Sequence, residues 1–287
     1  MNPELRAWQA SCITSAVELY TQQPHFLCQA TPGAGKTKMA AELAKRLLQE
    51  GKVDLIMCFA PSRQTVEGFQ RTFSTVLDRR MDGRIGAVGA VCTYQGMEYR
   101  DDEFWGLFKD YRVLAVFDEI HHCAGQDVLL SNAWGQQIIQ NVQDRAAYTL
   151  ALSGTPWRSD QRAIALARYS EPDGNLICDF RYGLQEAIDD GVCRSPRIVV
   201  LDNEMVRLTE SLAFETTVTV FPSITKLLSE SPVSYESLLF HDDILRQILT
   251  MACLKLTEIR ERHFDAGGLI VATNIEHAYV VASVLHR

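Results

Sequence analysis

A glycine-rich turn between a predicted strand and a predicted helix constrains this chain more than any other feature of its sequence. Residues 30–37 read Ala-Thr-Pro-Gly-Ala-Gly-Lys-Thr, and they lie between the apolar run 26–28 and a helix-forming stretch. Glycines in such a turn let successive N–H groups approach an anion, and the helix N-terminus adds partial positive charge. Lys36 is expected to reach the β- and γ-phosphates of a nucleotide, and the Thr37 hydroxyl to ligate magnesium. One position departs from the usual pattern, because Ala30 stands where glycine is expected.

An acidic pair ends a second apolar run. Residues 113–117 are continuously apolar, as expected of a strand that is buried on both faces of a parallel sheet, and Asp118 and Glu119 follow directly. Open α/β sheets bind their ligands beyond the carboxyl ends of the strands. The position therefore predicts that Asp118 holds magnesium and that Glu119 takes a proton from an attacking water. The alternative is a solvated acidic turn.

The segment Asp-Glu-Ile-His at 118–121 also carries a resemblance. After a phosphate-binding loop, it resembles motif II of the superfamily 2 helicases and translocases, the DEAD/DEAH-box proteins in the broad sense. Four more segments occur in the order of that family, at 5–9, 60–63, 93–95 and 153–156. They resemble the adenine-reading glutamine element, motif Ia, the threonine element before motif II, and motif III. The histidine in motif II and the Trp-Arg-Ser-Asp that follows motif III are similar to the branch of restriction-enzyme motors (type I and type III) and repair helicases.

The resemblance implies a RecA-like α/β fold, a P-loop parallel sheet flanked by helices, with ATP and Mg²⁺ as cofactors. For ATP binding it implies Arg6, Gln9, Thr31, Pro32, Gly33, Ala34, Gly35, Lys36 and Thr37. The implied catalytic residues are Lys36, Asp118 and Glu119, and the implied metal ligands are Thr37 and Asp118. Coupling to nucleic acid is implied for His121, Ser153 and Thr155, and contact with the nucleic-acid backbone for Arg63 and Thr93.

The first part of the chain alternates strands and helices, which is typical of a parallel sheet with helices on both faces. We expect strands at 25–30, 53–60, 84–92, 113–117 and 147–152, and helices at 3–20, 37–50, 63–78, 95–108 and 132–143. After Trp157 the pattern changes. We expect a short strand at 176–182, a helix at 183–190, a strand at 197–201, a mostly helical stretch from 208 to 264, a strand at 269–273 and a helix at 275–285.

These elements suggest three regions, and the third resembles the beginning of a second lobe. They are an ATP-binding helicase domain at 1–200, a helical linker or insertion at 201–265, and the incomplete start of a second RecA-like domain at 266–287. The arginine finger of this family lies late in the second lobe, and no such element is found here. In related nucleotidases that residue contributes about 10³–10⁵ in rate. We therefore expect this chain to bind Mg-ATP, to hydrolyse it very slowly, and to need a second lobe from a longer parent chain or a partner subunit.

The overall charge limits the way in which nucleic acid is bound. The net charge is −8 with a pI near 5.4, which argues against a protein that coats nucleic acid by bulk attraction. A local stripe of arginines in the segment around motif Ia remains possible, and so does a solvated helix face at about 64–77; the residues are Arg63, Arg71, Arg79, Arg80 and Arg84. DNA is favoured over RNA as the partner, although phosphate contacts carry little identity.

Other function classes remain open at this stage. A different P-loop enzyme, such as a kinase or ring-forming ATPase, is disfavoured by the Ser-Gly-Thr-Pro segment. A nucleotide-controlled scaffold is disfavoured by the intact Glu119. A metal cluster at 121–123 is disfavoured because adjacent residues point apart. The sequence begins without a secretory segment and has no run of 18 apolar residues, so we expect a cytoplasmic protein without a membrane partner.

Overall fold

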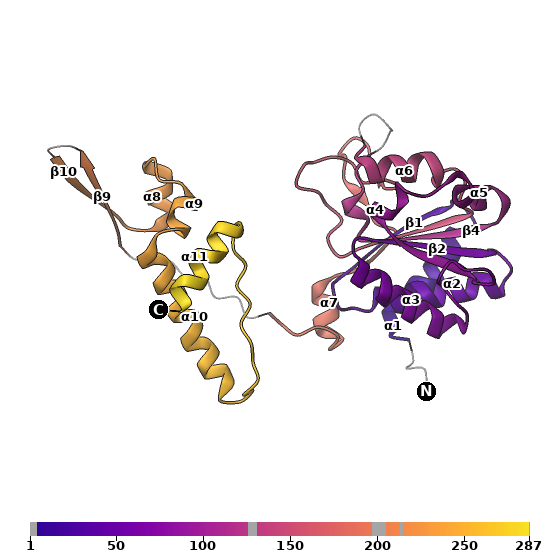
Figure 1. Cartoon of the computed structure of the whole chain (residues 1–287), viewed down its shortest axis with the longest axis horizontal. Coiled ribbons are helices and arrows are strands. Elements are labelled where there is room, and N and C mark those ends of the chain that lie inside the picture. The colour runs from indigo at the N-terminus through magenta and orange to yellow at the C-terminus, as the bar shows by residue number, and fades with distance from the viewer. Residues whose placement is uncertain (1–4, 126–130, 197–204, 213–214, 287) are drawn as a thin grey trace. The chain divides into compact units, whose positions relative to one another are not determined.

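A six-stranded parallel sheet forms the centre of the first of two compact units. The computed structural model describes residues 5–125, 131–196, 205–212 and 215–286, and the units comprise residues 1–195 and 196–287. The strand order is β3-β2-β4-β5-β1-β8 (Figure 1). The strands are β1 (His25–Ala30), β2 (Leu55–Ala60), β3 (Gly89–Thr93), β4 (Val113–Asp118), β5 (Tyr148–Ser153) and β8 (Phe180–Tyr182). The predicted α/β fold with a parallel sheet is confirmed.

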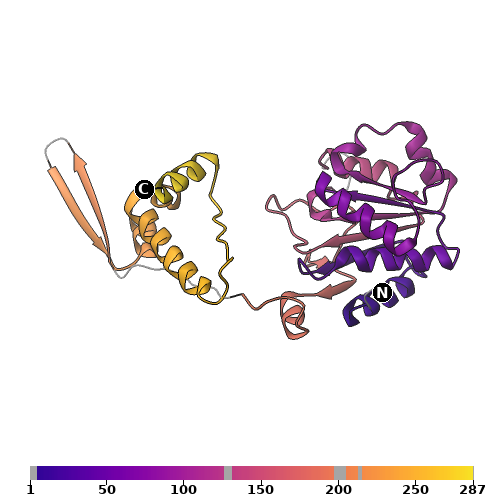
Figure 2. The same cartoon turned by 60° about the horizontal axis from the view of Figure 1, so that its bottom comes forward.

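Helices cover both faces of this sheet (Figures 1 and 2). One face carries α1 (Ala7–Leu19), α2 (Lys36–Gln49) and α3 (Arg63–Leu77), and the other carries α4 (Tyr94–Met97), α5 (Asp102–Asp110) and α6 (Ala133–Asn141). All six residues of β4 are buried. Because side chains alternate along a strand, Val116 packs into the core on the α1–α3 side and Phe117 into the core on the α4–α6 side. The continuous apolar run of β4 is therefore explained by burial on two sides.

The register of the parallel strands gathers the polar residues at one edge. Gln29 of β1 lies opposite Ser153 of β5, and Asp118 of β4 lies opposite Leu152 of β5. Parallel strands end at the same edge of their sheet, so the segments that follow β1, β4 and β5 emerge side by side. This edge carries the glycine-rich turn and the acidic pair.

Several predicted boundaries in the first unit were wrong for identifiable reasons. The strand expected from 84 begins at Gly89, because residues 80–88 fold into a turn in which the Val88 N–H donates to the Arg80 carbonyl. The helix expected at 95–108 is interrupted, and Asp101 caps the second helix, α5. Residues 176–182 divide into β7 (Leu176–Ile177), which pairs with β6 (Arg168–Tyr169), and β8; α7 (Leu184–Asp189) follows.

In the described part of the second unit, the first element is a hairpin that the helical expectation for 208–264 missed. Strands β9 (Val206–Leu212) and β10 (Glu215–Phe221) pair antiparallel. The run Thr-Thr-Val-Thr-Val in β10 is β-branched throughout, which favours strand over helix. The rest of that stretch is helical as predicted, and the last predicted helix is also present; these are α8 (Ile224–Glu230), α9 (Tyr235–Leu239), α10 (Asp242–Arg260) and α11 (Ile275–Leu285).

The strand predicted at 269–273 is not formed. A strand needs a neighbouring strand for its N–H and C=O groups, and among the described residues no strand pairs with this segment, in which Leu269 is 91% exposed. The strand predicted at 197–201 lies outside the described residues. Within the part of the chain that is described, no helix is long and apolar enough to span a bilayer.

Candidate functional site

The glycine loop, residues 30–37, connects the end of β1 to the start of α2. Two of its glycines have positive φ angles, 79° at Gly33 and 96° at Gly35, which disfavour other residues. At Gly35 space is also restricted, because an added Cβ would lie 2.9 Å from the side-chain nitrogen of Gln9. Ala30 is the last residue of β1 and pairs in register with Tyr182, so the strand needs no glycine there. This explains how the loop forms without the usual first glycine.

Helix α2 begins without a side-chain cap. Its N-cap is Gly35, whereas α3, α4, α5 and α6 each begin with a side chain that accepts a hydrogen bond from the first turn. The first N–H groups of a helix have no partner within the helix, and they attract an anion when no side chain satisfies them. Thr31 and Ala34 are buried in the loop, while Pro32 and Gly33 are exposed.

Lys36 connects the glycine loop to the acidic pair. Its side chain is buried, and the Nζ atom lies 3.2 Å from the Ala30 carbonyl oxygen and 3.3 Å from Oε1 of Glu119. A buried ammonium needs such partners, because an uncompensated charge is costly away from water. The loop and the end of β4 therefore meet at one cation.

Asp118 and Glu119 differ sharply in environment. Asp118 is the last residue of β4 and is 8% exposed; burial first, and then the neighbouring charge of Glu119, raise the pKa of its carboxyl to about 6. Glu119 has a φ of 50°, a left-handed conformation that turns the chain from β4 into the short 3₁₀ helix η1 (Ile120–His122). The Tyr94 hydroxyl donates to the Asp118 carbonyl at 2.7 Å and holds this turn.

The Glu119 carboxylate contacts both the turn after β4 and the end of β5. Its Oε2 atom lies 3.3 Å from the Gly154 N–H nitrogen, 3.4 Å from the Ser153 hydroxyl and 3.4 Å from Nδ1 of His121. The same Nδ1 is 2.9 Å from the Ser153 hydroxyl, which also accepts a hydrogen bond from the Thr155 N–H. Burial, followed by the neighbouring His122, lowers the pKa of His121. One small polar network therefore contains Lys36 and these residues.

Helix α1 supports the glycine loop from the side. The Arg6 guanidinium donates to the Ala34 carbonyl at 2.5 Å, and the Gln9 amide donates to the Gly35 carbonyl at 2.9 Å. The other end of the Gln9 side chain accepts the Arg6 N–H. Both predicted residues thus contact the loop through its backbone, and Gln9 has both of its polar ends engaged.

The remaining predicted residues lie outside this network. Thr37 occupies the first turn of α2. Arg63 is the exposed first residue of α3, and Thr93 caps α4 by accepting the Gly96 N–H. Ala60 and Thr93 are partners in the register of β2 and β3, so the segments that carry Arg63 and Thr93 leave neighbouring strands at the same edge of the sheet.

Three features of the site escaped sequence reasoning. A short strand was expected at 176–182, but its position beside β1 was not; the Tyr182 carbonyl of β8 accepts the Thr31 N–H, and the Tyr182 ring stacks on Trp8 of α1 at 4.8 Å. The Tyr94 contact with Asp118 and the contact of Arg158 with His121 were also missed. Each of these contacts joins segments that are far apart in the sequence, so no local sequence pattern predicts it. Among the described residues, no group of three or more His, Cys, Asp or Glu side chains is arranged to hold a metal ion.

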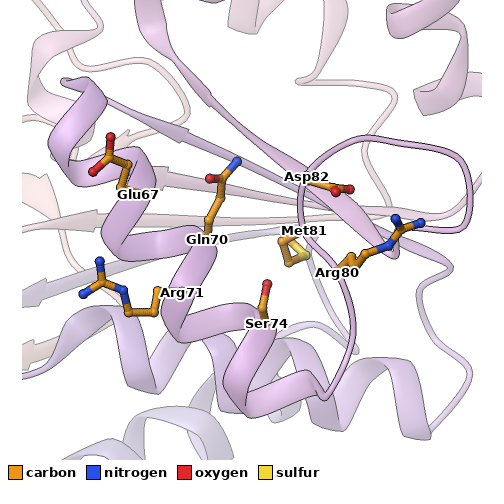
Figure 3. A pocket seen from close by; sticks show the side chains of 7 residues that line it. All are labelled: Glu67, Gln70, Arg71, Ser74, Arg80, Met81 and Asp82. Atoms are coloured by element: carbon orange, nitrogen blue, oxygen red, sulfur yellow. The ribbon is translucent and has the colours of Figure 1, made fainter.

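A groove of about 460 Å³ runs along α3, away from the residues above. Figure 3 shows Glu67, Gln70 and Ser74 on the helix and Asp82 on the neighbouring turn. Arg80 follows the end of α3, whereas Arg63 begins it, and the 15 residues of this helix span about 22 Å. The arginines of the predicted stripe therefore do not share one edge of the sheet. The groove carries both acidic and basic groups, so it lacks the basic character of a phosphate track.

Comparisons with known proteins identify a family and two relatives. The family described as type III restriction enzyme, res subunit, matches residues 2–158. The uncharacterized protein Rv2917 of Mycobacterium tuberculosis is 28% identical over 297 residues, which cover 99% of this chain and 47% of that protein. The uncharacterized protein ML1624 of Mycobacterium leprae is 27% identical over 304 residues, covering 98% and 47%. The chain thus spans about half the length of the curated relatives it matches.

A solved structure shares the fold. It is a nuclease-deletion mutant of the Type ISP restriction-modification enzyme LlaGI in complex with a DNA substrate mimic, with a TM-score of 0.50, 14% identity, and coverage of 66% of this chain and 21% of that chain. At this identity the likeness is one of fold. The family match, however, includes more than half of the chain, since residues 2–158 are 157 of 287. The chain therefore belongs to the type III restriction enzyme res subunit family, and its first unit is a helicase-like ATP-binding motor domain.

Proposed function

We propose that this chain is the ATP-binding module of a helicase or translocase that couples ATP hydrolysis to movement on nucleic acid, DNA rather than RNA. The observation that carries the proposal is the position of Glu119. Its carboxylate lies 3.3 Å from Lys36 of the glycine loop and 3.3 Å from the Gly154 N–H that follows β5. One catalytic group in contact with both segments can transmit the state of the nucleotide to the segment after β5.

The residues of the loop and the acidic pair suit a magnesium-bound triphosphate. The uncapped start of α2 and the ammonium of Lys36 bind the phosphate oxygens. Thr37 and Asp118 would hold Mg²⁺, which would supply positive charge to offset the charge of the phosphates. Glu119 orients the attacking water and accepts its proton. The buried Asp118 suits a cation. Burial and the charge of Glu119 disfavour its ionised form in the free protein, and a divalent ion would offset that cost.

Other residues of the loop and of α1 complete the nucleotide site. Backbone groups of Thr31, Pro32, Gly33, Ala34 and Gly35 surround the phosphates. Arg6 and Gln9 are placed beside the loop by their contacts with its carbonyls, and we assign them to the adenine end of the nucleotide. Each end of the Gln9 amide has one bonding position left for the base, because only one of its two N–H donors and one of the two lone pairs on its oxygen are engaged.

Coupling to nucleic acid is assigned to the ends of the neighbouring strands. His121, Ser153 and Thr155 form the polar contacts next to Glu119. Arg63 and Thr93 leave adjacent strands at the same edge and are proposed to contact the sugar-phosphate backbone, which positions a strand without reading its sequence. Residues 266–287 are proposed to begin a second RecA-like lobe, whose remainder lies in a longer parent chain or a partner subunit.

Calorimetric titration with Mg-ATP tests the nucleotide site. We expect the wild-type chain to bind, and the Lys36→Ala variant to lose binding because the buried ammonium that faces the phosphates is removed. Lys45→Ala is the matched control, since it removes the same side chain from α2 about 13 Å farther along the helix. A wild-type chain that is folded and takes up no nucleotide would contradict the proposal, as would equal binding by Lys36→Ala.

Stimulation of the ATPase separates this proposal from the other classes. In the full-length protein, duplex DNA is expected to raise the steady-state rate of ATP hydrolysis more than RNA does. A nucleotide-controlled scaffold would show binding without stimulated turnover. A P-loop enzyme of another kind would show turnover that does not respond to either nucleic acid.

A further inference from the structure

The segment that follows β5 folds back onto the turn that follows β4. The Gly125 N–H donates to the Ala163 carbonyl at 2.7 Å, and the Ala165 N–H donates to the Cys123 carbonyl at 2.9 Å. Between them, Ala124 and Ile164 form an antiparallel bridge. We call these two stretches, residues 121–125 and 158–165, the clasp. The two main-chain hydrogen bonds that make this bridge thus join two segments that lie about forty residues apart in the chain.

Arg158 adds a side-chain contact at the end of the clasp nearest the acidic pair. Its Nη1 atom donates to the His121 carbonyl at 2.5 Å, and the side chain is only 16% exposed. The Nε and Nη2 atoms donate to the two carboxylate oxygens of Asp160 at 2.8 and 2.6 Å. Because a bidentate pair fixes the plane of the guanidinium, Asp160 directs the third donor toward His121.

His121 is consequently held at both ends. Its carbonyl accepts from Arg158, while its ring nitrogen Nδ1 lies 2.9 Å from the Ser153 hydroxyl and 3.4 Å from Glu119. The ring also lies against His122, with 4.4 Å between ring centroids. A displacement of the His121 backbone would move the imidazole away from the carboxylate that is proposed to orient the water.

We propose that Arg158, oriented by Asp160, is a positioning residue for ATP hydrolysis: it holds the His121 backbone so that the imidazole stays against Ser153 and Glu119. The inference rests on the proposed function, because it acts through the proposed catalytic carboxylate. Arg158 itself makes no described contact with the glycine loop or with Asp118. Its removal is therefore expected to affect turnover and to leave nucleotide binding nearly unchanged.

The chain offers a close control for this arrangement. Arg112 also pairs with an aspartate through two nitrogens, at 2.9 and 2.6 Å from Asp54, and its Nη1 donates to the Gly51 carbonyl at 2.5 Å. That pair lies at the start of β4, whereas Glu119 follows the end of this strand. Arg112→Gln therefore removes the same set of contacts at the opposite edge of the sheet.

Steady-state kinetics of the full-length protein give the first readout. Arg158→Gln is expected to lower kcat for ATP about tenfold or more, since small displacements of catalytic groups cost that much, with KM changed less than about threefold. Arg158→Lys keeps the charge but loses the bidentate fork and is expected to restore little of the rate. Arg112→Gln should leave both constants unchanged, because its contacts lie at the opposite edge of the sheet. Equal kcat in Arg158→Gln and wild type overturns the inference, as does a loss that Arg112→Gln reproduces.

Proton NMR of His121 in the chain itself gives a second readout that needs no turnover. Burial, His122, Arg158 and Lys36 lower the pKa of His121, and Glu119 raises it. Arg158→Gln should raise that pKa and shift the imidazole signals, and Arg158→Lys should shift the signals because the ring moves. Unchanged signals in both variants overturn the inference. A wild-type protein without any ATPase activity would instead refute the proposed function. Failure of this inference and failure of the proposed function therefore give different results.

Discussion

Replacing Asp118 by asparagine should stabilise the nucleotide-free chain, although it removes a proposed metal ligand. Burial and the charge of Glu119 raise the pKa of Asp118 from 3.8 to about 6. Each pKa unit corresponds to about 1.4 kcal/mol, so the ionised carboxyl costs the folded state about 3 kcal/mol above pH 6. The amide has almost the same volume and carries no charge. The free energy of unfolding should therefore rise by up to about 3 kcal/mol at pH 7.5.

The pH dependence has a definite sign. Because the folded-state pKa of Asp118 lies above its ordinary value, the favourable contribution of the protonated form is complete below about pH 4 and is lost as pH rises through 6. The difference in free energy of unfolding between Asp118→Asn and wild type should thus be largest above pH 6 and should become smaller toward pH 4. A difference in free energy of unfolding between variant and wild type that does not change from pH 4 to pH 6 would contradict the assignment of a raised pKa to Asp118.

Urea unfolding followed by tryptophan fluorescence provides the assay. All four tryptophans, at 8, 105, 134 and 157, belong to the first unit, so the signal reports only on the unit that contains the site. Asp54→Asn is a control that should lower the free energy of unfolding instead of raising it. Pairing with Arg112 lowers the pKa of Asp54 to about 2, so the charge of this carboxylate favours the folded state. If Asp118→Asn unfolds at the same or a lower urea concentration than wild type at pH 7.5, the ionised Asp118 does not destabilise the folded state, and the reasoning is refuted.

Two further outcomes follow from the same geometry. Magnesium competes with the proton for Asp118, so the affinity for Mg-ATP should fall about tenfold per pH unit below pH 6 in a calorimetric series; affinity that stays level to pH 5 would exclude Asp118 as a ligand. Gly35→Ala should lower the free energy of unfolding by about 1–3 kcal/mol, because φ is 96° and the new methyl lies 2.9 Å from the Gln9 side chain. Gly33→Ala, with open space around its Cβ, should cost less in the same urea assay, and equal losses would show that crowding by Gln9 does not matter.

The sequence predicted the sheet because its signals are local. Continuous apolar runs gave β1, β2, β4 and β5 within a few residues, and strands buried on both faces need such runs wherever they occur. The hairpin β9–β10 was missed because amphipathic helical spacing in its neighbours outweighed its β-branched residues. The segment 269–273 has the composition of a buried strand, but composition cannot supply the partner that a strand requires.

The candidate site divides in the same way. The sequence by itself determined which groups are present: a glycine loop with Lys36, and an acidic pair at a strand end. Their positions next to a strand end or a helix start follow from their order along the chain, because each strand and helix forms from neighbouring residues. Only the tertiary structure decided that Glu119 contacts Lys36 and Gly154, that burial raises the pKa of Asp118, and that Arg158 holds His121. Those features depend on strand order and on what surrounds each group, and both arise only when segments distant in the chain pack together.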